Sequence, residues 1–448
     1  MSCKVRFAPS PTGFMHIGNA RIAIINYLFC KKNNGTFLLR IDDTDVLRST
    51  KEFEDAIMRD VAWLGISHDE FFRQSERIDR YSEIRDKLIA SGALYKCYET
   101  QEELDYKRKN AISKGNPPVY DREALKLTEA ERQKLDDSGT PHYWRFKLPN
   151  KTVSWKDLIM GEISYDLNSV SDPVIMKADG TYLYTYSSVI DDIDSGITHI
   201  IRGQDHVTNT AVQIAMFEEI AGYNLEFAHL SLLVGKDGSQ FSKRLGSLNL
   251  GNIRDEGVEP MAINSLLATL GSSSDTVPFN SMDALVEYFD LSKFSTNSPK
   301  FDVEDILKIN KKLLHIKSYE EIVKEIGELN CPSRNVFEVI RENVDSLKDY
   351  SIWKNVFSEE YKSPAKYSIE EQNVLRKASK ILGDLETLDE TTGNTFMDSV
   401  KEKTGASGKS LYMPLRRALT GMDHGPNIVQ IMVILGKEKA LKRFRSCS

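Results

Sequence analysis

The stretch APSPTGFMHIGN, residues 8–19, places two prolines, two glycines and a histidine between a strand-like segment and a long apolar one. Lys4–Ala8 alternates like a short strand, Asn19–Lys32 is typical of a helix that stops at the turn residues 33–35, and Thr36–Ile41 (TFLLRI) is a second strand. This order predicts a βαβ unit. The turn after the first strand of such a unit lies at the carboxyl edge of the parallel sheet, where α/β proteins bind ligands.

The residue types in this loop suit a phosphate site. Pro9 and Pro11 fix the backbone, while Gly13 and Gly18 permit close approach of a ligand. His16 lies at the start of the expected helix, whose unpaired backbone N–H groups attract phosphate. A proline-rich connector with a structural histidine would use the same residue types, so the loop alone leaves both interpretations open.

The composition is that of a globular protein of several domains, with 448 residues of which 40% are hydrophobic and 28% charged. A formal net charge of -7 argues against a protein that coats nucleic acid or membrane by bulk attraction. The five cysteines show no paired spacing, and no apolar run approaches the roughly 20 residues that span a bilayer. We therefore expect a cytoplasmic protein that does not act at a membrane.

The pattern changes after the βαβ unit. Ser49 and Glu52 have capping-box spacing ahead of an apolar helical face. Residues 94–180 are polar and contain short strand-like pieces such as HYWRFKL and KTVSWKDLI, which indicates an insertion. Buried-strand character returns at 183–190 and 197–201, as though the first sheet resumed.

The C-terminal third is expected to be helical. From Val303 onward, amphipathic segments rich in Lys and Glu replace the strand signals, and β-branched runs are scarce. The expected helices are 320–326, 335–343, 370–382, 413–421 and 428–445.

A second candidate loop is QFSKRLG, residues 240–246, which follows the turn-rich GKDGS. It presents Ser242, Lys243 and Arg244 in succession, and two cations with a hydroxyl can neutralise a polyphosphate as charge develops. A short basic surface loop would have the same sequence, so this stretch is weak on its own.

Together the two loops resemble the signature motifs of the class I aminoacyl-tRNA synthetases, which match His16–Asn19 and Gln240–Arg244. Five longer stretches are similar to bacterial glutamyl-tRNA synthetases and extend over almost the whole chain. They are RFAPSPTG (6–13), RIDDTD (40–45), RQSER (73–77), VIDDIDSGITHIIRGQDH (189–206) and MPLRRALTGMDHGP (413–426).

The resemblance implies an α/β protein with a Rossmann-like catalytic domain, an α+β insertion and an all-helical C-terminal anticodon-binding region. The implied parts are the first catalytic half 1–93, the acceptor-stem-binding insertion 94–182, the second catalytic half 183–235, the signature-loop and stem-contact helices 236–315, and the anticodon-binding region 316–448.

The activity implied by the resemblance is ATP-dependent ligation of L-glutamate to tRNA. Glutamate and ATP would give glutamyl-adenylate and pyrophosphate, and the acyl group would then pass to tRNA(Glu) with release of AMP. Magnesium would accompany ATP, and we expect a monomer. Charging of tRNA(Gln), instead of or beside tRNA(Glu), stays an open alternative.

The resemblance also implies roles for individual residues. Guanidinium groups suit the two carboxylates of glutamate, and an acidic residue suits its ammonium group. The implied glutamate-binding residues are Arg6, Ala8, Ser10, Asp42, Tyr184 and Arg202; the ATP-binding residues are His16, Gly18, Asp205, Leu233 and Lys243; the catalytic residues are His16, Lys243 and Arg244.

The chain departs from the family pattern at three places. Asp42 stands where the family often has glutamate, and Gln240 replaces the first lysine of the second loop. Some relatives bind zinc through a Cys-x-Cys pair in the insertion, but this chain has Cys97-Tyr98-Glu99 without a second Cys/His pair nearby. We therefore expect no zinc, with the insertion held by packing of Tyr143, Trp144, Phe146 and Trp155.

Two further alternatives remain at this stage. Glutaminyl-tRNA synthetase shares the catalytic half, but its anticodon-binding part is a β-barrel, whereas a helical C-terminal region is expected here. A non-catalytic RNA-binding relative would have lost activation, which the retention of His16, Lys243, Arg6 and Arg202 argues against.

Overall fold

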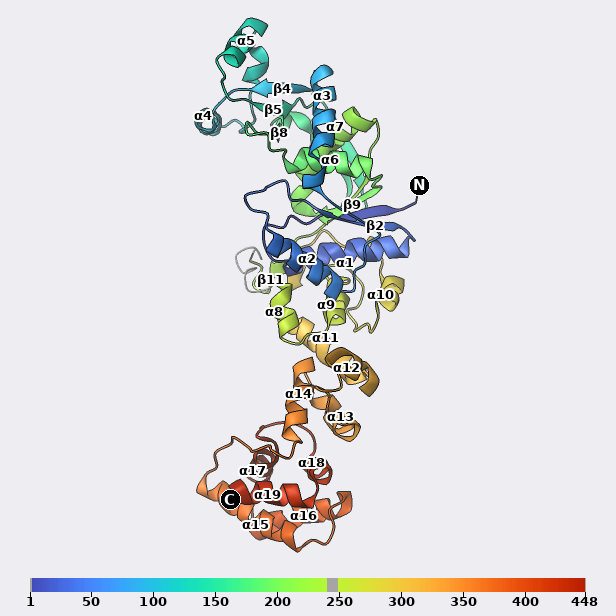
Figure 1. Ribbon diagram of the computed structural model, residues 1–448, viewed down its shortest axis with the longest axis vertical. Coiled ribbons are helices and arrows are strands. Elements are labelled where there is room, and N and C mark those ends of the chain that lie inside the picture. Colours follow the sequence, from blue (N-terminus) through green and yellow to red (C-terminus); the bar gives the residue numbers. More distant parts are fainter. Residues whose placement is uncertain (1, 240–248, 448) are drawn as a thin grey trace. The chain divides into compact units, whose positions relative to one another are not determined.

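The computed structural model describes residues 2–239 and 249–447, which form two compact units (Figure 1). The first unit comprises Met1–Arg254 and Ile263–Asp305. The second comprises Asp255–Ala262 and Ile306–Ser448.

The predicted βαβ unit is confirmed. Strand β1 (Lys4–Phe7) pairs in parallel with β2 (Thr36–Ile41), and β2 pairs in parallel with β3 (Glu70–Arg73). Helix α1 (Ile17–Lys32) lies beside β1 and β2 and is buried over most of its circumference (Figure 1). The loop 8–16 therefore leaves the carboxyl end of β1 and enters α1 from its N-terminal end.

Helices α2 (Lys51–Trp63) and α3 (Ile78–Ala90) follow. The predicted cap at Ser49 is wrong by one residue, because the side chain of Thr50 accepts the hydrogen bond from the Phe53 backbone N–H. Ser and Thr are both favoured N-cap residues, so two of them in succession leave the start undecided in the sequence.

The region 94–182 forms one antiparallel sheet and contributes two strands to another. In the first sheet the order is β4-β5-β8; in the second it is β7-β6-β10-β9, where β6 runs parallel to β10. Phe146 and Trp155 are buried in the same hydrophobic core as α6 and α7. The elements of this region are β4 (Leu94–Cys97), α4 (Gln101–Ser113), α5 (Glu129–Asp137), β5 (Tyr143–Phe146), β6 (Thr152–Asp157), β7 (Gly161–Asp166) and β8 (Val174–Met176).

The chain then returns to the first sheet, but through a helix. The predicted strand 183–190 is wrong: this segment belongs to helix α6 (Tyr184–Asp194). Every residue from Tyr186 to Asp192 is buried, so no periodic exposed face separates a helix from a strand in this sequence. Strand β9 (His199–Gly203) confirms the next predicted strand and lies beside β1, where the Thr198 N–H donates to the Lys4 carbonyl over 2.9 Å.

Seven further α-helices and β-strands lie in the described residues between 207 and 301. They are α7 (Val207–Ala221), β10 (Glu226–Leu230), β11 (Val234–Gly235), α8 (Leu250–Asp255), α9 (Pro260–Leu267), α10 (Met282–Tyr288) and β12 (Lys300–Phe301), which pairs in parallel with β11.

The second unit is helical, and no strand occurs in its described residues. Its helices bury two apolar clusters, one formed by α15–α19 and one centred on Phe337, Tyr350 and Trp353. The helices are α11 (Val303–Ile316), α12 (Tyr319–Ile326), α13 (Arg334–Ile340), α14 (Leu347–Val356), α15 (Ile369–Asp384), α16 (Glu390–Thr404), α17 (Lys409–Thr420), α18 (Ile428–Leu435) and α19 (Lys437–Cys447).

The single helix predicted for 428–445 is wrong, because Gly436 divides it into α18 and α19. Its φ of 77° with ψ of 159° lies outside the helical region and suits glycine alone. Among the described helices, none combines the length and apolar character needed to cross a membrane.

Candidate active site

A cavity of about 480 Å³ lies at the carboxyl ends of β1 and β9. Its wall is formed by the loop after β1, the first turns of α1, the first residue of α6 and the end of β9. Six of the predicted site residues line it: Arg6, Ala8, Ser10, His16, Tyr184 and Arg202. Residues almost 200 positions apart are thus brought together because β9 returns beside β1.

Arg202 is buried in this wall, with 5% of its surface exposed. Its Nη2 donates to Thr210 Oγ1 over 2.5 Å and to Gln213 Oε1 over 2.8 Å, and its Nη1 donates to the Tyr184 hydroxyl over 3.2 Å. All three acceptors are neutral. Within the described residues Arg202 forms no ion pair, and its Nε has no hydrogen-bond partner.

Burial lowers the pKa of Arg202, because the charged form loses water, and the positive charge of Arg6 acts in the same direction, although Tyr184 and Asp192 oppose the shift. An arginine nevertheless keeps its charge at neutral pH. A buried cation that lacks a counterion favours an anionic ligand, and the guanidinium geometry suits a carboxylate.

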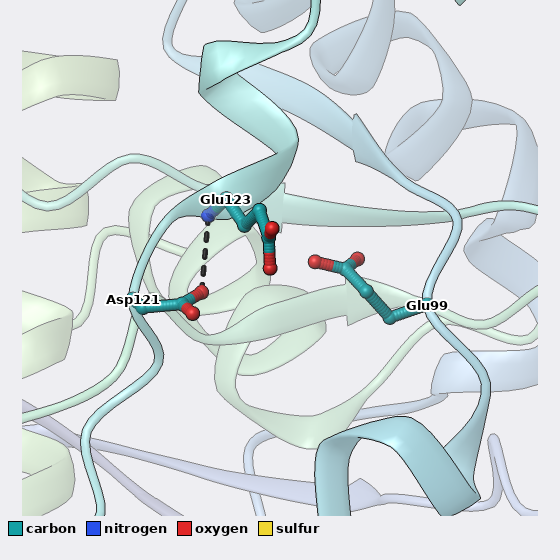
Figure 2. Close-up of side chains that lie close together, drawn as sticks. All are labelled: Glu99, Asp121 and Glu123. Atoms are coloured by element: carbon teal, nitrogen blue, oxygen red, sulfur yellow. Dashed lines mark hydrogen bonds between the residues drawn. The ribbon is translucent and has the colours of Figure 1, made fainter. Parts of the chain in front are cut away.

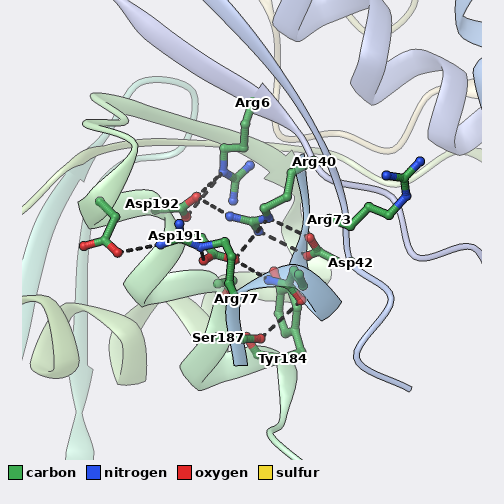
Figure 3. Close-up of polar contacts among 12 residues, drawn as sticks. Arg6, Arg40, Asp42, Arg73, Arg77, Tyr184, Ser187, Asp191 and Asp192 are labelled. Carbon is green, nitrogen blue, oxygen red and sulfur yellow. Dashed lines mark hydrogen bonds and ion pairs between the residues drawn. The ribbon is translucent and has the colours of Figure 1, made fainter. Parts of the chain in front are cut away.

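Arg6 also lines the cavity, but it is paired. Its Nε donates to Asp192 over 3.2 Å, and Asp192 in turn accepts from Arg40 Nη1 over 2.8 Å. Figure 3 shows Arg40 between Asp192 and Asp42. Arg6 is therefore oriented by a network of buried charges that includes Asp192 and Arg40.

Asp42 is not in the cavity wall. Both of its carboxylate oxygens accept hydrogen bonds from Arg40, over 2.6 and 3.1 Å. Burial raises the pKa of Asp42 to about 6, although Arg40 acts in the opposite direction. In this structure Asp42 is the counterion of Arg40, and its contact with a substrate ammonium group stays a prediction.

Sequence reasoning missed Arg40, Asp191 and Asp192, although both motifs that contain them were noted. Asp191 accepts from Arg77 Nε over 2.6 Å (Figure 3). It also accepts from the Tyr81 hydroxyl over 2.9 Å. The available signal was the presence of charged residues inside segments that otherwise read as buried. Such residues must pair with one another.

His16 caps helix α1 with one ring nitrogen. Its Nδ1 accepts from the Asn19 backbone N–H over 3.2 Å, while the Asn19 side chain accepts from the His16 backbone N–H over 3.3 Å. Burial lowers the pKa of His16, which favours the neutral ring. Since Nδ1 accepts, the proton of the neutral ring is on Nε2, which is thus a donor at a helix N-terminus.

Gly18 makes this arrangement possible. A Cβ atom at Gly18 would lie 2.9 Å from His16 Cε1 and 3.0 Å from its Nδ1, closer than side chains normally approach. Asp205 lies in the turn Gln204–His206 after β9 with 57% of its side chain exposed, and Leu233 is a buried apolar residue. Gly18, Asp205 and Leu233 are not in the cavity wall, and their ATP contacts stay predictions.

The predicted catalytic residues Lys243 and Arg244, and the substituted Gln240, lie outside the described residues. The described chain resumes at Asn249, which forms an antiparallel bridge with His16. The next N–H, that of Leu250, donates to the Met15 carbonyl over 3.0 Å. The chain that follows the second loop is thus attached directly to the first.

His206 is a lining residue that sequence reasoning missed. Its ring lies 5.9 Å from that of Tyr184, between centroids. Burial, reinforced by Arg202, lowers the pKa of His206 to about 4. A neutral His206 leaves the positive charge of this wall to Arg6 and Arg202.

The insertion contains one cluster of carboxylates, formed by Glu99, Asp121 and Glu123 (Figure 2). Their oxygens lie within 4.8 Å of one another, and Lys107 forms ion pairs with all three. Burial raises the pKa of the nearby Cys97 thiol to about 11, so the free thiol is protonated at neutral pH. The expectation that the insertion binds no zinc stays a prediction.

Comparisons with known proteins cover both units. Residues 2–308 match the family model "tRNA synthetases class I (E and Q), catalytic domain", and residues 320–447 match "Anticodon binding domain". Glutamate–tRNA ligase 1 of Maricaulis maris is 46% identical, with 98% of each chain covered. Glutamate–tRNA ligase 2 of Bartonella henselae is 43% identical at the same coverage.

A solved structure is similar over the full length. The glutamate tRNA ligase of Elizabethkingia meningosepticum, crystallised in complex with its amino acid, superimposes with a TM-score of 0.83 at 30% identity, covering 100% of this chain and 99% of that one. The matches of both family models and the identity to curated relatives along the whole sequence agree. The chain therefore belongs to the class I tRNA synthetases of the E and Q group and, within it, to the glutamate–tRNA ligases.

Proposed function

We propose that this chain ligates L-glutamate to tRNA in two steps. The α-carboxylate oxygen of glutamate attacks the α-phosphorus of ATP, pyrophosphate leaves, and glutamyl-adenylate forms. A ribose hydroxyl at the end of the tRNA then attacks the acyl carbon and AMP leaves. The observation that carries this proposal is the buried, counterion-free guanidinium of Arg202 in the wall of the cavity.

The side-chain carboxylate of glutamate would occupy the place that no acidic residue fills. Arg202 contributes the charge, and Tyr184 holds one edge of the guanidinium through its hydroxyl. Arg6, Ala8 and Ser10 would contact the rest of the amino acid from β1 and its loop. Glutamine, which is neutral, would leave the Arg202 charge uncompensated and should bind less well.

ATP would lie against the start of α1. The Nε2–H of His16 and the free N–H groups of the helix are donors for phosphate oxygens, and Lys243 with Arg244 would supply charge from the second loop. No residue acts as a nucleophile, so catalysis rests on positioning and charge stabilisation. Among the described residues that line the cavity there is no carboxylate, so magnesium would be held by ATP phosphates there.

ATP–pyrophosphate exchange tests the proposal. The assay contains tRNA, because relatives of this family activate glutamate only with tRNA bound. We expect exchange with glutamate and little with glutamine. Equal exchange with both amino acids, or none with glutamate, would contradict the assignment.

The tRNA partner needs a separate assay. We propose tRNA(Glu) as the acceptor, with a monomeric, cytoplasmic enzyme. Aminoacylation of purified tRNA(Glu) and tRNA(Gln) side by side, each with glutamate, measures this directly. Charging of tRNA(Gln) at a similar rate would replace this proposal with that of a non-discriminating enzyme.

Lys243 is expected to act on the transition state. Because Gln240 stands in place of the other lysine, Lys243→Ala should lower kcat for adenylate formation at least roughly 10²-fold, while the KM for ATP rises less. Adding Gln240→Lys to that variant should restore only part of the rate, since placement as well as charge matters. Near wild-type exchange by Lys243→Ala would refute the role.

A further inference from the structure

We propose that Asp157, His229 and Thr210 are positioning residues for glutamate recognition. They form a buried hydrogen-bonded chain that ends on the guanidinium of Arg202. None of the three lines the cavity, so they would act only through Arg202. This inference rests on the proposed glutamate site.

The hydrogen-bonded series of side chains begins where two strands of one sheet run in parallel. Asp157 ends β6, and His229 lies on the neighbouring strand β10. His229 Nδ1 lies 2.5 Å from Asp157 Oδ2, and its backbone N–H donates to Oδ1 over 3.1 Å. Both side chains are fully buried. The ring therefore has one orientation, set by two contacts with the same carboxylate.

Asp157 is an ionised anchor. Burial alone would raise its pKa, but the hydrogen bond from His229 and those from the backbone N–H groups of Met160 and Ile159 lower it. An ionised carboxylate can only accept, so His229 Nδ1 carries a proton. In the neutral ring this leaves Nε2 as the acceptor.

Thr210 connects the ring to the arginine. Its Oγ1 lies 2.8 Å from His229 Nε2 and 2.5 Å from Arg202 Nη2. The same hydroxyl also lies 3.2 Å from the His206 carbonyl, but the contact with His229 Nε2 is shorter and favours donation there. When the hydroxyl donates its proton to His229, its lone pairs point to the guanidinium, which can only donate. The direction of every hydrogen bond from Asp157 to Arg202 is then fixed.

Neutral acceptors next to Arg202 serve recognition better than a carboxylate would. A carboxylate at the position of Thr210 would pair with Arg202 and compete with the substrate. Through His229 and Thr210, the negative charge of Asp157 instead adds to that of Asp192 in supporting the buried cation from a distance, and the Nε–H of Arg202 has no partner among the described residues. Gln213 adds a second neutral acceptor, itself held by Ser188.

The test compares two substitutions of Thr210 in the full-length enzyme. Thr210→Val keeps the shape and removes the hydroxyl, whereas Thr210→Ser keeps the hydroxyl. Thr269→Val is the matched control, because Thr269 is equally buried in the same unit and its hydroxyl bonds elsewhere. The KM values for glutamate and ATP are measured by pyrophosphate exchange with tRNA present, together with the unfolding midpoint in urea.

We expect Thr210→Val to raise the KM for glutamate about 10-fold, the usual effect of losing one hydrogen bond to a charged group, with the KM for ATP changed less than about twofold. Thr210→Ser should restore the glutamate KM, and Thr269→Val should leave both KM values unchanged. If Thr210→Val does not fold, His229→Gln, which keeps a polar group toward Thr210 but loses the contact with Asp157, should raise the glutamate KM in the same selective way.

An unchanged glutamate KM in folded Thr210→Val, or a parallel rise in both KM values, would overturn the positioning role while leaving the proposed function intact. Absence of glutamate-dependent exchange by the unaltered enzyme would overturn the proposed function, and this inference with it.

Discussion

Two buried arginines on strands of the same unit, Arg40 on β2 and Arg202 on β9, have opposite surroundings. Arg40 is fully buried, donates to Asp42 and Asp192, and lies 3.8 Å from Asp191. Arg202 is buried almost as deeply, yet its partners are a threonine, a glutamine and a tyrosine. The comparison gives a testable criterion: a buried charge paired with opposite charges is structural, whereas one with only neutral partners is a candidate for binding a ligand.

The largest expected effect is on folding. Arg40→Met should lower the free energy of unfolding by about 3–5 kcal/mol, because it leaves Asp42 buried without a cation. Urea unfolding of Arg40→Met and Arg202→Met side by side measures this. Arg202→Met should lower the free energy of unfolding by at most about 1–2 kcal/mol, because only neutral acceptors lose their hydrogen bonds. Equal destabilisation by the two substitutions would remove the distinction.

Arg202→Met should instead affect substrate recognition. We expect a loss of about 2–5 kcal/mol in kcat/KM for glutamate, because the substrate carboxylate would be buried unpaired, with the KM for ATP little altered. Exchange kinetics with each substrate varied in turn separate the two effects. A folded Arg202→Met enzyme with an unchanged glutamate KM would make Arg202 a structural residue like Arg40.

Asp42 should make the free energy of unfolding depend on pH. Its pKa is about 6 in the folded protein against an ordinary 3.8, so protonation favours folding: the contribution is complete below pH 3.8 and is lost as pH rises through 6. Between pH 4 and 6 the wild type should therefore lose about 1–3 kcal/mol of unfolding free energy relative to Asp42→Asn. Urea unfolding of both proteins across this range checks the slope, and parallel curves would contradict it.

The smallest effect is expected for an exposed pair of similar geometry. Arg48 lies 2.6 Å from Asp45, but its side chain is 74% exposed. Water and salt screen this pair, so Arg48→Met should leave the urea midpoint unchanged within error. A clear shift would show that distance alone, without burial, decides the strength of these ion pairs.

The sequence predicted local structure where an element has two distinct faces or clear end signals. Strand β2 and helix α12 lie within a residue of their predicted positions. Helix α6 was mistaken for a strand because it is buried on all sides, and the break at Gly436 was missed because one glycine in a helical pattern is common.

The motifs predict residues that line the cavity, but they do not predict how the buried charges pair. Arg202 and His16 follow from the resemblance, and the cavity contains both. The motifs do not predict that Asp42 pairs with Arg40. Arg40 also pairs with Asp192, which is 152 residues away in the sequence and meets it only in the folded chain. Local patterns carry no information about such tertiary pairing.

Because His16 caps helix α1 and also lines the cavity, its side chain can report on both the helix start and nucleotide binding. Its two ring nitrogens differ, because Nδ1 accepts a hydrogen bond from the helix backbone, whereas Nε2 is the atom proposed to donate to phosphate. In nitrogen-15 spectra the two resonances are resolved according to which atom carries the proton. A titration followed at this single imidazole would read the integrity of the helix start from one signal and nucleotide occupancy from the other.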